Sequence, residues 1–437
     1  MNTIVVKFGG TSLASAEQIR KAAAIILSDP ARRFVVASAP GKRSGADTKV
    51  TDLLYQCFDA ASAGGDFAPV LAQIRTRFAD IIRELAIDFD LDAEISVIRA
   101  HLENGPQRDY MASRGEYLNS KIIAAYLGFA FLDTAELVRF SADGRFEDAQ
   151  TDLNLRAALA GVERAVLPGF YGATAEGTIH TFSRGGSDVT GSLVARAADA
   201  AVYENWTDVS GMLFTDPRIV DNPRTIEYIT YRELRELSYM GASVLHEDAV
   251  FPVRKAGIPI NIRNTNRPED AGTMIVPELP EGVPLRNVTG IAGRSGFTSV
   301  LVEKSMMNSE VGFGSKLLEI FAAHGVPFEH CPTGIDTMSV FVGSNEFREN
   351  KDALLQHIRR ELQPEFISVE SGLSLIAVVG HGLVSAKGSA ARMFRALAEA
   401  NINIRMIDQG SSEMNIIIGV EDADYANAVR ALYQIFQ

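Results

Sequence analysis

The chain has 437 residues, of which 46% are apolar, and this length exceeds the size at which one hydrophobic core keeps growing. We therefore expect two or three domains. Acidic residues outnumber basic ones by 55 to 42, and the formal net charge of −13 argues against nucleic-acid binding through a basic surface. The two cysteines, Cys57 and Cys331, are too few for a disulfide scaffold and fit a reducing cytoplasm.

The sequence carries no signal for a membrane segment or for a metal held by protein side chains. No run of about 18 apolar residues occurs and no leader precedes the first strand, so we expect a cytoplasmic protein without membrane contact. The seven histidines show neither HExxH nor paired-cysteine spacing, so any metal is expected to arrive with a nucleotide. Neither the GxxxxGK[ST] nor the GxGxxG nucleotide motif is present.

The first predicted element is a buried strand over residues 4–8. Its apolar residues are β-branched or aromatic, and Lys7 interrupts them near the end of the strand. Gly9 and Gly10 follow, ahead of apolar residues at helical spacing. Glycines let backbone N–H groups approach a ligand, and a helix N-terminus favours negative charge, so the stretch is a candidate phosphate site. A tight turn with a solvent-facing lysine explains the same residues equally well.

Strand and helix signals alternate up to about residue 276, which predicts an α/β domain over residues 1–276. We expect a central, largely parallel sheet flanked by helices. A proline-rich stretch without apolar periodicity lies within residues 277–286 and is typical of a linker. The other expected strands of the first domain are 34–39, 165–170, 201–206 and 259–263, and residues 55–127 are mostly helical in pattern.

The pattern after the linker predicts a second type of domain. Residues 297–370 have the βαββαβ order of a ferredoxin-like module, and residues 371–437 repeat this order without its sixth strand. A strand within residues 287–296 precedes the first module. We infer that it completes the second module, so that the first module is inserted in the second. The uncovered sheet faces favour pairing with another copy, as a homodimer or homotetramer, and offer a place for a small effector.

Two further segments combine charged residues with a helix start. Glu116, in "ASRGEYLNSKIIAAYL", is either a first-turn helix acid or an acceptor for a substrate ammonium. In "FSRGGSDVTGSLVARAADA", Arg184 offers a planar fork for a carboxylate, whereas Ser187 and Asp188 stand at a helix start. A capped helix explains this segment less well, because capping needs only one of these residues. If Asp188 faces Lys7, it holds the lysine charged and oriented.

The segments after residue 203 mix turn residues with packing residues. In "ENWTDVSGMLFTDPRIV", the Asp-Pro pair is a common turn signal, and Arg218 is a candidate phosphate contact. The segment "GASVLHEDAVFPVRKAGIPINIRNT" is mainly architectural in pattern. Its His246 is expected to be a packed or hydrogen-bonded histidine and not a ligand, because no partner ligands share its face.

Together these motifs resemble aspartate kinase, in sequence order and over essentially the whole chain, including a C-terminal pair of ACT-type regulatory modules. Each motif alone is weak, whereas four in order are specific. The resemblance is carried by Lys7-Phe8-Gly9-Gly10-Thr11-Ser12, Ser113-Arg114-Gly115-Glu116, Arg184-Gly185-Gly186-Ser187-Asp188, and Trp206-Thr207-Asp208-Val209 with Thr215-Asp216-Pro217-Arg218.

The resemblance implies transfer of the γ-phosphoryl of ATP, bound with Mg²⁺, to the side-chain carboxylate of L-aspartate. This step opens the route to lysine, threonine and methionine. Carried over motif by motif, the catalytic residues are Lys7 and Asp188. The phosphate-binding residues are Gly9, Gly10 and Ser12, and those for aspartate are Thr51, Glu116, Arg184 and Ser187. The nucleotide side comprises Thr207, Asp208, Leu213, Arg218 and Ser243. No residue is assigned to a metal.

Two positions depart from the family pattern. Ser243 stands where many members carry a lysine, and Leu213 stands where some carry a tyrosine. Both lie on the implied nucleotide side, so the adenine contacts are less well defined than the aspartate site.

The C-terminal modules resemble those that bind an end-product amino acid between paired domains. Ser309 and Phe313 lie at a strand-to-helix turn whose helix N-terminus suits an effector carboxylate, and Glu329 is an acid for a lysine ammonium. A core role for Phe313 and a solvated Glu329 explain these residues equally well. We expect lysine as the inhibitor, with threonine as the second choice.

Two other functions are kept as alternatives. One is another kinase of the same superfamily, acting on N-acetylglutamate, glutamate or a nucleoside monophosphate. Glu116 and Arg184 favour a free α-amino acid instead. The other is a catalytically silent amino-acid sensor, against which the intact set of charged residues counts.

Overall fold

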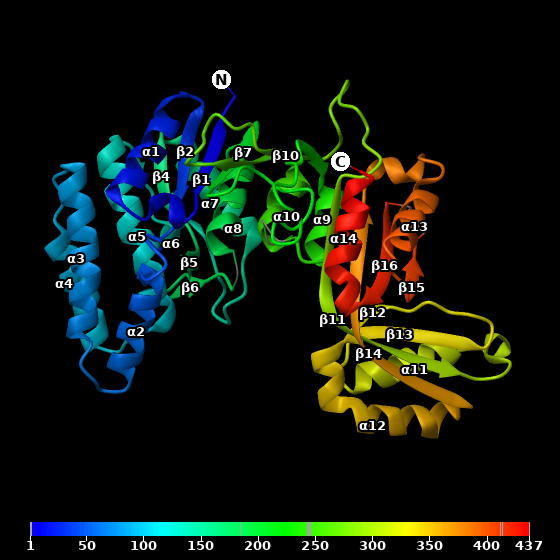
Figure 1. The fold of residues 1–437 in the computed structure, drawn as a ribbon. Helices are drawn as coiled ribbons and strands as arrows, with labels where there is room; N and C mark the ends of the chain where they lie inside the picture. Colours follow the sequence, from blue (N-terminus) through cyan, green and yellow to red (C-terminus); the bar gives the residue numbers. More distant parts are fainter. Residues whose placement is uncertain are drawn as a thin grey trace. The chain divides into compact units, whose positions relative to one another are not determined.

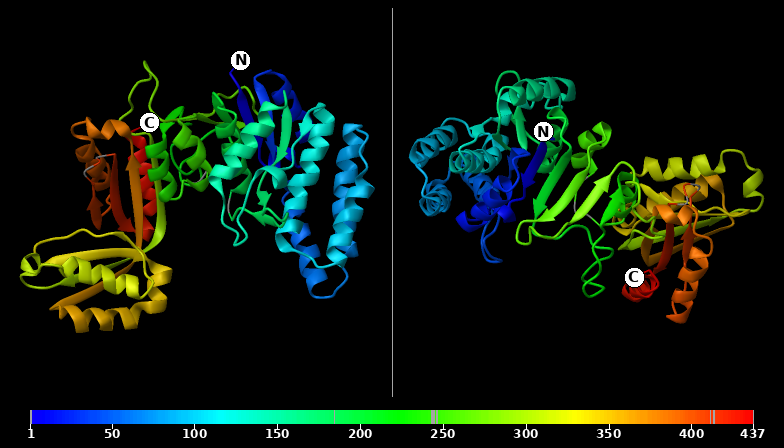
Figure 2. Two further views of the ribbon diagram at one scale, coloured as in Figure 1. Left: turned by 180° about the vertical axis from the view of Figure 1, so that it is seen from behind. Right: turned by 90° about the horizontal axis from the view of Figure 1, so that it is seen from above.

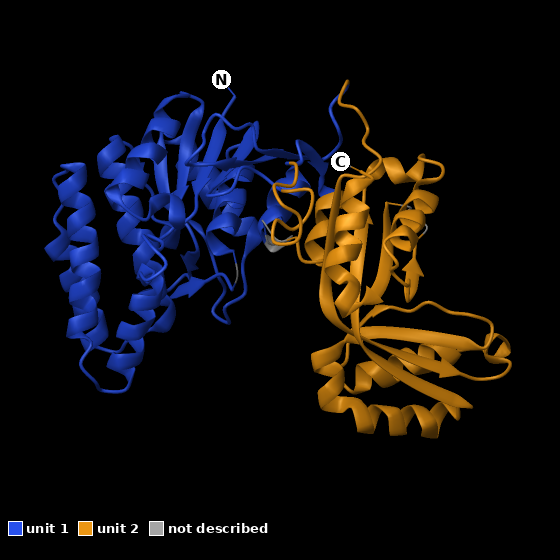
Figure 3. Ribbon diagram, viewed as in Figure 1, with its two compact units in different colours: residues 1–212, 225–231, 244–281 blue, residues 213–224, 232–243, 282–437 orange. Residues whose placement is uncertain are grey.

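The structure of the protein is a computed structural model that describes residues 2–183, 185–242, 245, 247–410, 412 and 414–436 (Figure 1). The chain forms two compact units (Figure 3). Unit 1 comprises residues 1–212, 225–231 and 244–281, and unit 2 comprises residues 213–224, 232–243 and 282–437. The two short segments between residues 213 and 243 thus group with the C-terminal residues. The predicted boundaries at 276 and 286 stay a proposal.

The sheet of unit 1 has eight strands in the order β3-β4-β2-β1-β7-β9-β10-β8. All neighbouring strands pair in parallel except β9 and β10, which are antiparallel. The predicted α/β class with a largely parallel sheet is therefore confirmed. The strands are β1 (Ile4–Phe8), β2 (Arg32–Ala37), β3 (Ala130–Phe131), β4 (Ala165–Pro168), β7 (Val202–Thr207), β8 (Tyr228–Thr230), β9 (Ile260–Asn264) and β10 (Thr273–Val276).

Helices cover both faces of this sheet. On one face, α1 to α5 form a continuous apolar core with strand residues that include Val6 and Phe8 of β1. Helix α8 packs on the other face, against β1, β2 and β7, with α7 and α10 beside it. The helices are α1 (Ala16–Leu27), α2 (Val50–Ser62), α3 (Ala68–Leu85), α4 (Leu91–Glu103), α5 (Arg108–Leu127), α6 (Thr134–Leu137), α7 (Asp148–Ala160), α8 (Gly186–Ala197) and α10 (Glu247–Ala256).

Helices α3 and α4 lie side by side at one edge of unit 1 in all views (Figure 2). They account for much of the helical pattern predicted over residues 55–127. A short hairpin, β5 (Tyr171–Ala173) with β6 (Ile179–Thr181), completes the unit. Within the described part of the chain, no helix is long and apolar enough to cross a membrane.

The first helix begins several residues after the glycine pair. Gly9 and Gly10 lead into a short 3-10 turn, η1 (Thr11–Leu13), and not directly into the α-helix. Ser15 then caps α1 by accepting a hydrogen bond from the Gln18 N–H. The α-helix therefore does not directly follow the glycine pair, because a serine N-cap fixes the helix start several residues downstream.

Unit 2 is built on a six-stranded antiparallel sheet in the order β12-β13-β11-β14-β16-β15. Its strands are β11 (Gly290–Glu303), β12 (Phe328–His330), β13 (Thr337–Gly343), β14 (Phe366–Val379), β15 (Met406–Asp408) and β16 (Asn415–Glu421). Its helices are α11 (Phe313–Ala323), α12 (Ser344–Leu362), α13 (Ser389–Glu399) and α14 (Tyr425–Gln434), together with most of α9 (Tyr231–Tyr239).

The two long strands β11 and β14 run through both modules. The first part of β11 pairs with Ser374–Val379, next to β16, and its last part pairs with Phe366–Ser371. The strand before the first module therefore completes the second, which confirms the predicted insertion. The sequence pattern predicts two separate strands where β11 runs and two more where β14 runs, and this detail is wrong. Gly296 and Gly372 have positive φ angles, so each strand bends there without ending.

Candidate active site

Lys7 and Asp188 form the centre of the site in unit 1. Side chains alternate along a strand, so Val6 and Phe8 point into the core of α1 to α5 and Lys7 points to the α8 face. Its Nζ lies 2.5 Å from an oxygen of Asp188 in the first turn of α8. The side chains are 9% and 19% exposed, so this ion pair is largely shielded from water. The expected pairing of the two residues is present.

Asn205 is a third member of this group that the sequence analysis missed. It is the register partner of Lys7 on the neighbouring strand β7. Its Nδ2 donates a hydrogen bond of 2.7 Å to the same Asp188 oxygen that contacts Lys7. Asp188 is thus held by a cation and an amide at once. Asn205 lies in the segment "ENWTDVSGMLFTDPRIV", but only the strand-pairing register shows that it stands beside Lys7.

The glycine turn lies directly beside the lysine. A Cβ on Gly9 would be 3.8 Å from the Lys7 Nζ, so the backbone there passes close to the ammonium group. The Gly9 N–H is already used, because it donates to the Trp206 carbonyl at 3.0 Å. The Gly10 N–H has no acceptor among the described residues, which leaves one donor for a ligand. Ser12 is buried, and its Oγ accepts from Thr265 Oγ1 at 2.8 Å.

The loop after β2 packs tightly on Gly10. A Cβ on Gly10 would lie 2.9 Å from the Ala39 carbonyl oxygen, and a Cβ on Gly41 would lie 2.6 Å from the Gly10 carbonyl carbon. Neither position accepts a side chain without a shift of the backbone. The turn after β1 and the loop after β2 therefore form one rigid wall at the carboxyl ends of adjacent parallel strands, where α/β sheets commonly bind ligands.

Glu116 meets this wall from helix α5. It is 6% exposed, and burial raises its pKa to about 8, although a hydrogen bond from the Ala39 N–H and the charge of Arg114 oppose this shift. Its Oε2 is buried without a partner among the described residues. One turn along the helix, Asn119 donates to the Ser38 carbonyl at 2.7 Å. A buried carboxyl oxygen without a partner is suited to receive a ligand cation.

The charge of Arg114 lowers the pKa of Glu116, and this arginine is held by aromatic rings. Its guanidinium carbon lies 4.4 Å from the ring centroid of Tyr110 and 4.3 Å from that of Tyr117. The Ser113 hydroxyl accepts from two of its nitrogens. The arginine therefore stabilises this part of α5 through stacking, with no carboxylate bonded to it among the described residues.

Arg77 connects several segments of the site from helix α3. It is 4% exposed, and one of its terminal nitrogens donates to the carbonyls of Gly41 at 2.6 Å and Ala14 at 3.0 Å. The other donates to Asp47 at 2.6 Å. Hydrogen bonds from Arg43 and the charge of Arg77 hold the pKa of Asp47 well below its usual range. The sequence analysis missed Arg77, because a lone arginine in an amphipathic helix carries no local signal.

The structure describes two of the three other residues that are predicted to bind the substrate. Thr51 lies in the first turn of α2, half-buried. Ser187 lies in the first turn of α8, and a Cβ on Gly169 would be 2.6 Å from its Oγ, so it packs on the segment after β4. Arg184 lies outside the described residues. The roles assigned to these residues stay predictions.

The predicted nucleotide residues divide between the two units. Thr207 ends β7 and donates to Asp208 at 3.3 Å. Leu213 and Arg218 belong to unit 2, where Arg218 forms an exposed ion pair with Asp216 at 2.6 Å. Ser243, like His246, lies outside the described residues. The nucleotide assignments are therefore still predictions.

The predicted effector residues have partners within unit 2. Phe313 is 3% exposed and belongs to the core of the first module. Glu329 accepts from Arg294 at 2.7 Å and also from the Tyr239 hydroxyl. Ser309 lies in the short turn η2 (Met307–Ser309). An effector at Glu329 must therefore compete with, or add to, an existing ion pair.

Comparison with known proteins agrees with this geometry. The model of the amino acid kinase family matches residues 2–264, and a model of the ACT domain matches residues 376–436. Aspartokinase 3 of Bacillus subtilis is 40% identical over 455 aligned residues, which cover 99% of this chain and 98% of the relative.

Solved structures are similar over the full length. The crystal structure of Clostridium acetobutylicum aspartate kinase has 45% identity and a TM-score of 0.90, with 100% of both chains covered. The structure of Escherichia coli aspartokinase III with aspartate and ADP (R-state) has 26% identity and a TM-score of 0.72. The structure of the same kinase with lysine and aspartate (T-state) has 25% identity and a TM-score of 0.70. Each comparison covers 99% of both chains. The chain therefore belongs to the amino acid kinase family, as one of its aspartate kinases.

Proposed function

We propose that the protein transfers the γ-phosphoryl group of ATP to the side-chain carboxylate of L-aspartate, giving 4-phospho-L-aspartate. The observation that carries this proposal is the shielded Lys7–Asp188 pair beside a glycine turn, with a partnerless carboxyl oxygen of Glu116 on the same wall. The similarity to a kinase solved with aspartate and ADP supports the same substrates.

Phosphoryl transfer needs positioning and charge stabilisation more than covalent help from the protein. A carboxylate is already a competent nucleophile, so no general base is required. The Lys7 ammonium stabilises charge that develops on the transferring phosphoryl oxygens, and the free Gly10 N–H adds a donor. Asp188, itself held by Asn205, keeps the lysine aimed at that position. Ser12 supports the turn after β1, which faces the phosphate.

The aspartate substrate has two further charged groups to be bound. Glu116 accepts its α-ammonium, which converts the buried acid to a carboxylate with a paired cation. Arg184 binds its α-carboxylate, and Thr51 and Ser187 complete this part of the site. These roles stay proposals that rest on the family motifs and on the position of Glu116.

Thr207, Asp208, Leu213, Arg218 and Ser243 are proposed to contact the nucleotide. Magnesium arrives with ATP and supplies charge neutralisation at the phosphates. The described residues contain no group of three or more His, Cys, Asp or Glu side chains arranged to hold a metal ion.

The second unit is proposed to regulate this reaction in response to an amino acid. Lysine is the first choice, because a similar kinase is solved with lysine in its T-state, and threonine is the second. Ser309, Phe313 and Glu329 are the proposed contacts. On this basis the enzyme serves the synthesis of lysine, threonine and methionine. A homodimer or homotetramer in the cytoplasm also stays a proposal.

A substrate panel tests the reaction. The purified chain is assayed for ATP-dependent hydroxamate formation with L-aspartate, L-glutamate and N-acetyl-L-glutamate. We expect turnover with L-aspartate alone, and turnover with glutamate or N-acetylglutamate instead would move the assignment to another kinase of the superfamily. Lysine and threonine are then titrated separately, and inhibition by neither would overturn the proposed regulation but not the reaction.

A further inference from the structure

A loop that follows β7 in the chain belongs to unit 2 and not to unit 1. It spans residues 213–224, and Figure 3 shows it in the colour of the C-terminal residues. The Phe214 N–H donates to the Arg224 carbonyl at 2.9 Å, so the two ends of the loop are joined. Leu213 and Arg218, two of the residues proposed to contact the nucleotide, lie in this 213–224 loop.

The tip of the 213–224 loop is a tight turn that presents Arg218. The N–H groups of Ile219 and Val220 both donate to the Asp216 carbonyl, at 3.0 and 3.1 Å. The Arg218 side chain is 88% exposed and bonds to the Asp216 carboxylate. An ion pair at such an exposed position contributes little free energy, so a phosphate group can replace the carboxylate.

The base of the loop is held by helix α14 and strand β11. Phe214 is 1% exposed, and its ring packs edge-on against Tyr433 of α14, with 5.6 Å between the ring centroids. Its carbonyl accepts from the Ile291 N–H of β11 at 2.7 Å. The Tyr433 hydroxyl also accepts from the Arg224 N–H at 3.2 Å. One tyrosine of α14 therefore contacts both ends of the loop.

A second residue of α14 reaches the tip of the loop. Arg430 lies on the same side of the helix as Tyr433, since residues three apart are neighbours on a helix surface. Its Nε donates to the carbonyl of Ile219, the residue after Arg218, at 2.9 Å. Its Nη1 donates to Asn427 at 3.1 Å, which fixes the direction of the guanidinium. Helix α14 therefore holds the loop both at its base and at its tip.

These contacts limit the conformations open to Arg218 before a nucleotide binds. A loop without them has to be ordered when the ligand arrives, and the entropy lost in that step lowers affinity. Arg430 and Tyr433 thus have a role toward the loop that is separate from the folding of their own helix. The buried residues of α14 are different ones, namely Ala428, Val429 and Leu432.

We propose that Tyr433 and Arg430 are positioning residues for ATP binding, which hold the 213–224 loop so that Arg218 is aimed at the phosphates. Both act through the loop and not by touching the nucleotide. This role rests on the nucleotide contact proposed above for Arg218. Since α14 lies within the residues matched by the ACT domain, 376–436, the regulatory module then contributes to ATP binding even when no effector is present.

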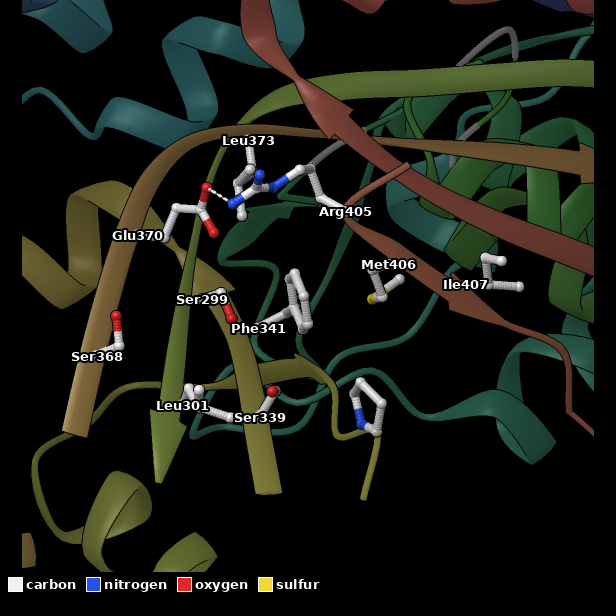
Figure 4. Close-up of a pocket in the computed structure, with 11 residues that line it drawn as sticks. Ser299, Leu301, Ser339, Phe341, Ser368, Glu370, Leu373, Arg405, Met406 and Ile407 are labelled. Atoms are coloured by element: carbon white, nitrogen blue, oxygen red, sulfur yellow. Dashed lines mark hydrogen bonds and ion pairs between the residues drawn. The ribbon is translucent and has the colours of Figure 1, made fainter. Parts of the chain in front are cut away.

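The cavity in the sheet of unit 2 takes no part in this arrangement. It has a volume of about 340 Å³ and is lined by residues of β11, β13, β14 and β15 together with Pro332 and Arg405 (Figure 4). No described residue of the 213–224 loop or of α14 lines it. A ligand in that cavity would therefore be bound by other residues than those that hold the loop.

Binding is tested on the full chain by calorimetry with ADP and Mg²⁺ as the probe, without aspartate. R430A removes the donor to Ile219, and Y433L removes both the ring and the hydroxyl of Tyr433. We expect each variant to raise the Kd for ADP at least about threefold, the scale of one lost hydrogen bond or ring contact. The matched control is R395A, which changes an exposed arginine on α13 of the same module and should bind ADP as the wild type does.

A second measurement separates positioning from a general loss of structure. The Kd for L-aspartate and kcat should stay within about twofold of wild type in R430A and Y433L, whereas the KM for ATP should rise with the Kd for ADP. Equal losses for ADP and aspartate would show a structural role and overturn the proposal. Thermal unfolding verifies that each variant is folded, and R430A decides the question alone if Y433L does not fold.

R218Q separates this proposal from the proposed function. If R218Q weakens ADP binding and R430A does not, Arg218 contacts the nucleotide without help from α14, and the positioning role alone is wrong. If R218Q binds ADP as the wild type does, the loop has no nucleotide role and the positioning role falls with it. Weaker ADP binding in R430A, together with no aspartate turnover by the wild type, would instead refute the proposed reaction and keep the positioning role.

The double variant R430A/R218Q tests whether Arg430 acts through the loop. Once the Arg218 guanidinium is absent, releasing the loop should have no further effect. We therefore expect the Kd for ADP of the double variant to lie within about twofold of that of R218Q. Full addition of the two single effects would show that Arg430 acts by another route and would overturn the proposal.

Discussion

Lys7 and Asp188 lie 2.5 Å apart across the carboxyl end of β1 and the first turn of α8, and Asn205 shares the same carboxylate. In a shielded site this arrangement fixes the ammonium in one direction before substrate arrives. Preorganised charge of this kind stabilises a transition state more effectively than a mobile lysine does, because no reorganisation is needed during the reaction.

The first prediction concerns the ammonium itself. Lys7→Ala should lower kcat by about 10²-fold or more, since removing one preorganised donor has effects of this size. Asp188→Asn should lower kcat less, because the lysine stays but loses its partner. Hydroxamate formation measures both. Lys21→Ala is the control, since Lys21 contacts only Glu17 and Asn266 among the described residues, both in exposed surroundings. Near-normal turnover of Lys7→Ala would remove Lys7 from the mechanism.

The second prediction concerns the pH dependence of stability at Glu116. Folding raises its pKa from the usual 4.5 to about 8, so between these values the folded protein holds a proton that the unfolded chain has released. Stability therefore falls as pH rises through this window, and the loss is complete above about pH 8. Glu116→Gln lacks this titration. The free energy of unfolding of the variant minus that of wild type should therefore increase from pH 5 to pH 8, by up to roughly 4 kcal/mol.

Thermal or urea unfolding at a series of pH values measures this difference. The same variant should bind aspartate poorly, and the wild-type affinity for aspartate should rise with pH up to about 8, because an ammonium requires the ionised acid. Parallel pH profiles for wild type and Glu116→Gln would show that the buried acid does not titrate in this range.

The third prediction concerns Arg77, which contacts no predicted ligand position itself but bonds to Gly41, Ala14 and Asp47. Arg77→Ala should lower kcat/KM for aspartate at least about tenfold, because it frees the loop that packs on Gly10 and bonds to Glu116. Millimolar guanidinium should restore part of the activity by occupying the vacated site.

Arg83→Ala on the same helix is the matched control, since the one partner of the Arg83 side chain among the described residues is exposed Asp80. A purely structural role for Arg77 would lower the melting temperature without rescue by guanidinium. That outcome would remove Arg77 from the positioning of the site.

The fourth prediction concerns Gly10. A methyl group there would lie 2.9 Å from the Ala39 carbonyl oxygen, closer than side chains are found in proteins, so the two loops must separate. Gly10→Ala should lower kcat by about tenfold or more while the rest of the fold persists. Gly45→Ala is the control, because a Cβ at Gly45 meets nothing within 4 Å. Equal activity of Gly10→Ala and Gly45→Ala would contradict the tight packing of the turn after β1 on the loop after β2.

Local patterns in the sequence were enough to predict the class of both units. The alternation of strand and helix signals predicted the largely parallel sheet of unit 1, and the incomplete second module correctly predicted the insertion. Lys7 and Asp188 each stand at the border of a strand or helix next to glycines, and the sequence predicts their pairing only on the condition that the two segments face each other. These features depend on neighbours along the chain, so a single sequence contains them.

Contacts between distant segments were decided only by the tertiary structure. Asn205 reaches Asp188 through the register of β1 and β7, and Arg77 reaches Gly41 from a helix whose pattern shows only amphipathicity. Strand β11 continues past Gly296 because it pairs with β14 on both sides of the bend. The physical reason is the same in each case: the free energy of these contacts depends on which surfaces pack together, and no local sequence period encodes that choice.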